Sequence, residues 1–502
     1  MYRFVKNYYL IALAALLLSF SRLPLYLGWL VFFAFVPLLI HIERREHKIG
    51  EWLLSALLFA LIQVALVFYW IASVTFGGLV GIWLLFALFY FIAFVLLQRI
   101  WYHLPALRLP AFVSIFISFE FLQNFSQIRF PWWNIGYSLS SFLALLQALD
   151  IGGMSLLALL ILSLNYLFFR VAQRDRRAWI GIGLIFIVWY AYGNYRLLTL
   201  PLTEEDVPIA VMQPSIKADD KWDDAKYQNI ITRYAELCER ASENDKKLII
   251  FPEAAIPSYL LLDPKVRVDL DELIQDHQID IFTGFPHAVR APADYPVPYY
   301  SYNAASLFTR DGKHQDLYYK NILVPVGERM LWLEHFPFLW KLEFGQANWE
   351  FGTEIPRYHY RNKEFSPSIC YELAFPHFLQ RANFQDGKGG HRKADFHVNI
   401  TNDAWFGTSY GPWLHGIMTK FRAIESRTQF YRSANTGISM IVDPKGQILT
   451  STKLFEICNI SAPLYTCAVR PFYNRIYRYP WAFVAIMILL AILSFLSPRR
   501  VE

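Results

Sequence analysis

The sequence has little charge and little cysteine for its length. Only 18% of its 502 residues are charged, whereas 55% are hydrophobic and 18% are aromatic. This balance excludes an ordinary soluble protein and indicates a chain that is partly embedded in a membrane. The length is sufficient for two or three domains with a large core.

The four cysteines are Cys238, Cys370, Cys458 and Cys467, without CxxC spacing or neighbouring histidines. This pattern argues against a zinc site and gives no support for a disulfide framework, although one Cys458–Cys467 bridge stays open. The net charge of +6 would suggest nucleic acid only if the basic residues formed a patch on a soluble face. Many of them lie instead in short loops between apolar runs, so membrane topology explains them and no nucleic-acid partner is expected.

Apolar runs in residues 1–200 predict seven membrane spans, and an eighth lies near the end of the chain. The predicted spans are Asn7–Ser21, Leu23–Ile40, two helices within 52–98, Leu109–Phe125, Ile151–Phe169, Ala178–Tyr195 and Trp481–Leu496. A cleaved signal peptide is the alternative for the first run, but no small-residue cleavage site precedes the second. Residues 130–149 are also uncharged, yet their proline, glycine and tryptophan content favours a re-entrant or surface-lying segment.

The arginine-rich loops predict the topology of these spans. With about eight spans, those short loops and both termini fall on one side, which is the cytoplasm by the positive-inside rule. The long segment 201–475 then falls on the other side. We therefore expect a membrane domain in 1–200, an extracytoplasmic domain in 201–475, and a last span with a short cytoplasmic tail in 476–502.

Segment 201–475 alternates predicted strands and helices. The predicted strands are Val207–Met212, 247–251, Asp280–Gly284 and Phe396–Ile400, and the predicted helices are Asp223–Arg240 and Trp413–Phe430. Turn sequences at 310–313 and 443–446 predict two hairpins. This alternation predicts an α/β layered sandwich.

Three residues with reactive side chains each follow an apolar run directly: Glu253, Lys320 and Cys370. In open α/β sheets, functional groups collect at the strand ends, so these three are predicted to converge. A carboxylate beside a thiol can take its proton, and an ammonium lowers the thiol pKa and stabilises a tetrahedral oxyanion. The alternative for Glu253 and for Lys320 is a partly buried salt bridge without chemistry, and for Cys370 a small side chain that only fills the core. Together the three favour catalysis.

These motifs resemble the nitrilase superfamily and, with the membrane block, its apolipoprotein N-acyltransferase family. The resemblance rests on Gln213–Ile216, Lys221–Asp223, Phe251–Pro257, Lys320–Glu328, Ile369–Glu372, Thr401–Gly407, Gly411–Trp413 and Arg432–Gly437, with Thr75–Gly78 and Phe130–Trp132 in the membrane block. It covers nearly the whole chain. Ile322, Val326 and Arg329 depart from the usual family pattern, which bears on substrate preference rather than on the reaction.

The resemblance implies a multi-pass α-helical membrane domain joined to a nitrilase-like αββα sandwich. It implies that Glu253 is the general base, Cys370 the nucleophile and Lys320 the oxyanion stabiliser. The supporting residues that it implies are the further carboxylates Glu328 and Glu372 and the substrate-contacting aromatics Trp222 and Tyr371.

The same resemblance implies an enzyme of the cell inner membrane that works on the periplasmic side. Cys370 would attack an ester of a phospholipid, expected to be phosphatidylethanolamine, to give an acyl-thioester and a lysophospholipid. The α-amine of the diacylglyceryl-modified N-terminal cysteine of an apolipoprotein would then take the acyl group. We expect a monomer without metal or cofactor.

Two other functions compete with this one. A membrane-anchored amidase would use water as the acceptor. A transporter would place ionisable groups in mid-membrane, and Glu120 is the only charge clearly inside a predicted span, so transport is disfavoured.

Residues 330–340 form an aromatic segment beside Glu328. A core helix is one interpretation, but Pro337 argues against a regular helix. The density of aromatic side chains also suits a loop that enters the headgroup region of the membrane and guides acyl chains to the thiol.

Overall fold

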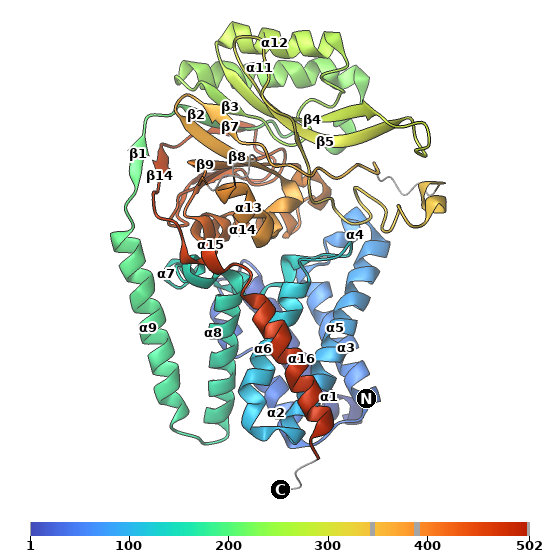
Figure 1. The fold of residues 1–502 in the computed structure, drawn as a ribbon, viewed down its shortest axis with the longest axis vertical. Coiled ribbons are helices and arrows are strands. Elements are labelled where there is room, and N and C mark those ends of the chain that lie inside the picture. Colours follow the sequence, from blue (N-terminus) through green and yellow to red (C-terminus); the bar gives the residue numbers. More distant parts are fainter. Residues whose placement is uncertain (1, 342–346, 386–391, 499–502) are drawn as a thin grey trace. The chain divides into compact units, whose positions relative to one another are not determined.

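The computed structural model describes residues 2–341, 347–385 and 392–498, and the chain divides into two compact units (Figure 1). We call the unit of Met1–Thr199 and Arg475–Glu502 the membrane unit, and we call the unit of Leu200–Asn474, which contains the three predicted catalytic residues, the catalytic unit.

Long apolar helices make up most of the membrane unit. They are α1 (Tyr2–Arg22), α3 (Ile49–Val67), α5 (Phe76–His103), α6 (Arg108–Leu122), α8 (Leu149–Ala172), α9 (Ala178–Thr199) and α16 (Pro480–Leu496). Within the described residues, five helices are long and apolar enough to cross a membrane: α3, α5, α6 with the turn before it, α8 and α9. The apolar part of α1 and the whole of α16 are shorter. The predicted count of about eight spans is therefore not confirmed.

The second predicted span, Leu23–Ile40, is not one helix. It is divided into a short 3-10 helix η1 (Gly28–Phe32) and a nine-residue α2 (Val36–Arg44). The reason is long-range packing, because Gly28 lies so close to the carbonyl of Ser138 that a Cβ would sit 2.1 Å from its oxygen. A straight helix through this stretch would lose that contact.

Residues 130–149 also lack a helix of span length, as predicted. They form η3 (Pro131–Trp133), η4 (Ile135–Leu139) and α7 (Leu143–Leu146). Short irregular elements leave carbonyls unpaired, and Arg22 donates to three of them, at residues 132–134, over 2.5–3.0 Å. The carboxyl group of Glu120 accepts from the backbone N–H of Ile135 at 2.7 Å. These two buried polar side chains hold the segment in place.

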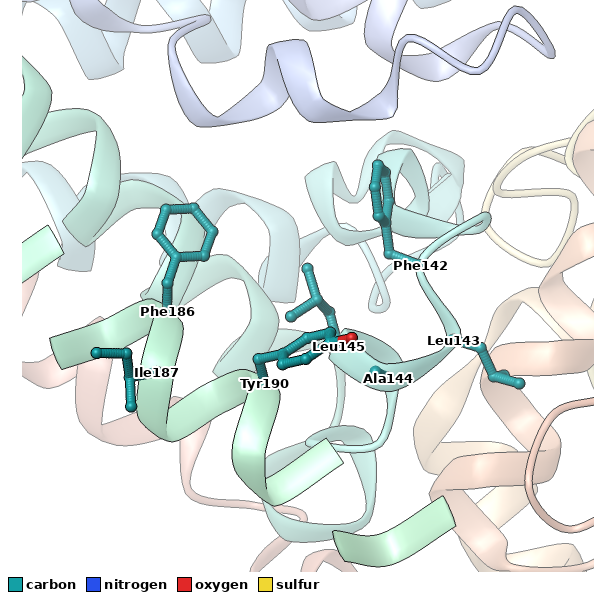
Figure 2. A pocket seen from close by; sticks show the side chains of 7 residues that line it. All are labelled: Phe142, Leu143, Ala144, Leu145, Phe186, Ile187 and Tyr190. Carbon is teal, nitrogen blue, oxygen red and sulfur yellow. The ribbon is translucent and has the colours of Figure 1, made fainter. Parts of the chain in front are cut away.

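An apolar groove of about 500 Å³ lies along α7 and α9 (Figure 2). The residues that line it are Phe142, Leu143, Ala144, Leu145, Phe186, Ile187 and Tyr190. None of them is a thiol, carboxylate or amine, so this groove cannot supply the groups that the sequence predicts for catalysis.

Two six-stranded sheets form the centre of the catalytic unit. The first has the order β13 (Cys458–Ile460), β2 (Ile209–Gln213), β3 (Leu248–Ile250), β4 (Asp280–Arg290), β5 (Tyr299–Phe308) and β6 (Tyr318–Tyr319). The second has the order β12 (Ile448–Ser451), β11 (Met440–Val442), β10 (Gln429–Ala434), β9 (Phe396–Thr401), β8 (Lys363–Ile369) and β7 (Tyr358–Tyr360). A separate pair joins β1 (Thr203–Glu205) to β14 (Leu464–Thr466).

Helices cover the outer face of each sheet, which gives the predicted αββα sandwich (Figure 1). α11 (Tyr227–Glu243) and α12 (Pro264–His277) pack on the first sheet, and α13 (Pro376–Phe384) and α14 (Gly411–Ser426) on the second. In α11 the buried residues recur every three or four positions, so one face of the helix joins the core of the sheet. Every residue of β2, β9 and β10 is buried, as expected for strands covered on both faces.

Parallel pairing places the functional residues at one edge. β2, β3 and β4 run parallel in the first sheet, as do β8, β9 and β10 in the second. The carboxyl ends of parallel strands lie at the same edge of a sheet, and ligand sites form there.

One sequence prediction fails in this unit, and one alternative that the sequence left open is decided. The helix predicted to reach Phe430 ends at Ser426, because Arg427 adopts a left-handed conformation (φ 52°) and β10 begins at Gln429. The bridge left open between Cys458 and Cys467 is not formed, since all four cysteines are free.

Candidate active site

Glu253 lies three residues after β3, in a turn where Ala254 has a positive φ of 45°. Its Oε1 accepts from the Nζ of Lys320 at 3.1 Å and the Nδ2 of Asn303 at 2.7 Å. Its Oε2 accepts from the backbone N–H of Asn402, which follows β9 of the other sheet, at 2.9 Å. The carboxylate therefore joins the ends of strands from both sheets.

Lys320 directly follows β6 and is fully buried. Its ammonium donates to Glu253 at 3.1 Å and to the Oε1 of Glu328 at 2.8 Å. Burial lowers the pKa of Lys320, but the two carboxylates raise it more, so the pKa lies well above its usual value. The group is therefore a fixed cation.

Cys370 occupies the first position after β8, with a φ of 48° that is rare for a residue with a side chain. A nucleophile held in a strained turn between a strand and a helix projects its reactive atom beyond the sheet. Burial, and then the charge of Glu253, raises the pKa of the thiol, while Lys320 offsets part of this. The lowered thiol pKa expected from the ammonium is not the net result, so the resting thiol is protonated and needs a base.

The two further carboxylates hold loops in place around the triad. Glu328 accepts from Lys320 through Oε1 and from the backbone N–H of Val324 through Oε2, at 2.8 Å each. Glu372 is fully buried and accepts four hydrogen bonds, from the hydroxyl of Tyr318 and the backbone N–H groups of Ile369, Asn321 and Ile322 (2.5–3.0 Å). Glu372 thus ties the loop that carries Lys320 to the turn that carries Cys370.

The two aromatic residues implied by the family resemblance differ in exposure. The side chain of Trp222 is 58% exposed, at the end of the short helix α10 (Ala218–Lys221). Tyr371 is buried and packs edge-on against Phe375, with ring centroids 5.1 Å apart. Only Trp222 therefore presents a free ring surface to a ligand in this conformation.

A buried network beside the thiol was missed by sequence reasoning. The Nε2 of His415, on α14, lies 3.1 Å from the carbonyl oxygen of Cys370 and must donate to it. The Nδ1 of His415 lies 2.9 Å from Asp403, and Arg432 donates to the other oxygen of Asp403 at 2.7 Å. The network fixes the backbone of the strained turn. Asp403 lies in the motif Thr401–Gly407, which contributes to the family resemblance, but nothing in the local sequence singles out His415.

Cys370, Asp403 and His415 could form a metal site by proximity alone, since their ligand atoms lie within 4.8 Å of one another. Their bonding argues against it. Both ring nitrogens of His415 already face protein partners, and the guanidinium of Arg432 reaches both Asp403 and the Nδ1 of His415 (3.1 Å). A cation placed there would face Arg432, so these residues do not fit a metal.

The aromatic segment 330–340 does not form a core helix, so the first of the two interpretations given above is wrong. It consists of turns followed by the short 3-10 helix η6 (Pro337–Lys341). Trp332, Phe336 and Phe338 are 46%, 49% and 61% exposed, whereas Leu333 is buried. Several large rings therefore face outward from this part of the catalytic unit.

Comparisons with known proteins agree with both units. A family profile described as Carbon-nitrogen hydrolase matches residues 208–462, and one described as Apolipoprotein N-acyltransferase N-terminal domain matches residues 14–167. The apolipoprotein N-acyltransferase of Chlorobaculum tepidum is 30% identical over 90% of this chain and 89% of its own length, and that of Geobacter metallireducens is 29% identical over 98% and 95%. A solved amidase of the nitrilase superfamily from Nesterenkonia AN1 has a TM-score of 0.40 and 17% identity over 57% of this chain and 99% of its own.

Proposed function

The chain belongs to the apolipoprotein N-acyltransferase family, and from this membership we propose that Cys370, Glu253 and Lys320 transfer a fatty acyl group from a phospholipid to a lipoprotein amine. One observation carries the assignment of roles. The carboxylate of Glu253 bridges both sheets while it contacts Lys320, and both groups act electrostatically on a thiol that is protonated at rest.

The first step forms an acyl-enzyme. The sulfur of Cys370 attacks the ester carbonyl of the phospholipid, and its proton passes to Glu253. The negative charge on the carbonyl oxygen is stabilised by Lys320. The ester C–O bond then breaks, the proton moves from Glu253 to the departing alkoxide, and a lysophospholipid leaves.

The second step discharges the thioester. The free α-amine of the diacylated N-terminal cysteine of an apolipoprotein attacks the thioester carbonyl, and Glu253 accepts a proton from the nitrogen. The C–S bond breaks, the amide forms, and the thiolate of Cys370 regains a proton. Neither step needs a redox partner or a co-reactant.

We assign the donor as phosphatidylethanolamine and the location as the periplasmic side of the cell inner membrane, with the enzyme acting as a monomer. The exposed rings of Trp332, Phe336 and Phe338 support contact with lipid, since aromatic side chains are favoured at the headgroup level. The arginine-rich loops 44–48 and 170–177 support a cytoplasmic side for the ends of the helices that they connect.

The experiment that tests this proposal asks whether the acyl group is transferred to an amine or to water. Purified enzyme is given phospholipid and a diacylated lipopeptide with a free amino terminus, and products are separated by mass. We expect a triacylated lipopeptide and one lysophospholipid for each transfer, and no product from a lipopeptide with an acetylated amino terminus. Release of free fatty acid at the same rate with either lipopeptide would show an amidase-like hydrolase and overturn the proposal.

A further inference from the structure

Lys221, at the end of α10, is a buried lysine that the mechanism above does not use. Its side chain is 3% exposed, and its Nζ donates one hydrogen bond of 3.0 Å, to the backbone carbonyl of Glu253. An ammonium has three N–H donors. Two of them therefore have no acceptor in the described part of the chain, although the group is enclosed beside the catalytic base.

The charges around the triad show why a second cation matters. Lys320 contacts two carboxylates, those of Glu253 and Glu328. These three groups bring one positive and two negative charges into a buried site, where an excess of negative charge opposes both a thiolate and an oxyanion. Lys221 adds a second positive charge at the backbone of Glu253, so the site then holds two ammonium groups and the two carboxylates of Glu253 and Glu328.

We propose that Lys221 balances the charge of this active site: its ammonium compensates the second negative charge, which Lys320 alone leaves unbalanced, and stabilises the anionic states that form at Cys370. It also fixes the turn of Glu253 through the backbone carbonyl. The inference rests on the proposed function, but its consequence for the thiol is measurable without any substrate.

The electrostatics of Lys221 agree with this role. Burial lowers the pKa of Lys221, the carboxylate of Glu253 and a thiolate at Cys370 raise it, and the net value is about 8. The ammonium is therefore the main form at neutral pH. It loses its proton as the pH rises past 8, which would remove the compensating charge.

The test is the rate at which iodoacetamide, a small uncharged reagent, alkylates Cys370 in the full-length protein in detergent, with the site identified by peptide mass spectrometry. Lys221→Gln keeps a donor for the carbonyl of Glu253 but removes the charge. We expect alkylation at pH 7.5 to slow about tenfold, as for a thiol pKa raised by one unit. Lys221→Arg keeps the charge and should keep most of the rate.

Lys393 provides a matched control. It is a partly buried lysine whose ammonium donates to backbone carbonyls, those of Arg427, Cys467 and Val469, with none of the triad among these partners. Burial likewise lowers its pKa to about 8. Lys393→Gln should reduce the melting temperature but leave the alkylation rate of Cys370 unchanged. A folded Lys221→Gln variant that alkylates at the wild-type rate would overturn the inference.

A double variant separates charge from structure. Adding Glu328→Gln to Lys221→Gln removes one negative charge, so alkylation should recover toward the wild-type rate. Further slowing would contradict the charge balance. Should Lys221→Gln fail to fold, Lys221→Met replaces it with the same expected results. Because alkylation needs neither phospholipid nor lipoprotein, failure of acyl transfer in the wild type would refute the proposed function and leave this comparison intact.

Discussion

Glu253 and Glu372 are two buried glutamates that each follow a strand of the sandwich. They differ in the groups that donate hydrogen bonds to their carboxylates. Glu253 accepts from the ammonium of Lys320, beside an amide side chain and one backbone N–H. Glu372 accepts four hydrogen bonds, from three backbone N–H groups and the Tyr318 hydroxyl, and has no ammonium partner among the described residues.

The pKa values of the two carboxyl groups move in opposite directions. Burial raises both, but Lys320 and Asn303 outweigh it at Glu253, whose pKa falls below its usual value. At Glu372 burial dominates and raises the pKa to about 7. The contacting ammonium, rather than the number of hydrogen bonds, therefore separates the two pKa values, and it favours Glu253 for the base role that we propose because this carboxyl group loses its proton more readily. Glu372 serves to hold two loops together.

Replacing the base should give the largest effect. Glu253→Gln keeps the size of the side chain but cannot take the proton of the thiol, so acyl transfer should fall by roughly 10²–10⁴-fold. Single-turnover formation of the acyl-enzyme measures this loss, with Glu272→Gln, at an exposed glutamate on α12, as the control. A rate near the wild-type value would remove Glu253 from the base role.

Replacing the second glutamate should mainly affect stability. Glu372→Ala leaves a buried hydroxyl and three backbone N–H groups without an acceptor, and each unsatisfied buried donor costs about 1–3 kcal/mol. Tyr318→Phe removes only one of those hydrogen bonds and should cost about 1 kcal/mol. Thermal unfolding in detergent measures both. If Glu372→Ala kept full stability but lost all acyl-enzyme formation, Glu372 rather than Glu253 would be the base.

The stability contributions of Glu253 and Glu372 should change with pH in opposite directions. Glu372 has a raised pKa in the folded state, so its contribution is complete below its unfolded pKa, near 4.5, and is lost as pH rises through about 7. Glu253 has a lowered pKa, so its contribution is present above its unfolded pKa and is lost on acidification. The melting temperature of the wild type minus that of Glu372→Gln should fall as the pH rises from 5 to 8. The melting temperature of the wild type minus that of Glu253→Gln should instead increase as the pH rises from 3 to 5. The same slope for both would contradict the comparison.

The aromatic segment should give the smallest effect. Trp332 and Phe338 are exposed, so replacing both with Ser should slow acyl transfer several-fold with little loss of stability. Leu333, which is buried in the same segment, is the control, and Leu333→Ala should cost about 2–5 kcal/mol. Unfolding of the double Ser variant would refute contact between this loop and lipid.

Much of the catalytic unit was predictable because the signals are local. Buried strands appear in the sequence as short apolar runs, and Glu253, Lys320 and Cys370 each follow such a run. The motifs around them predicted the family, which the matching profiles and relatives confirm. The αββα arrangement followed from the same resemblance.

The remaining features depend on contacts between distant residues. His415 lies within an apolar stretch of α14, and only the fold brings it to the carbonyl of Cys370. Asn303 lies in the middle of β5, where no sequence signal marks it as a partner of Glu253. The second predicted span failed for a similar reason, since hydropathy does not record that the chain at Gly28 packs against Ser138.

The nucleophile is the central claim, and intact-mass analysis tests it most directly. Wild-type enzyme incubated with phospholipid alone should gain the mass of one acyl chain on Cys370, removable by hydroxylamine and discharged by a diacylated lipopeptide. Cys370→Ala should gain nothing. Acyl transfer that persists in Cys370→Ala, or an acyl chain found on Cys238, Cys458 or Cys467 instead, would contradict the account.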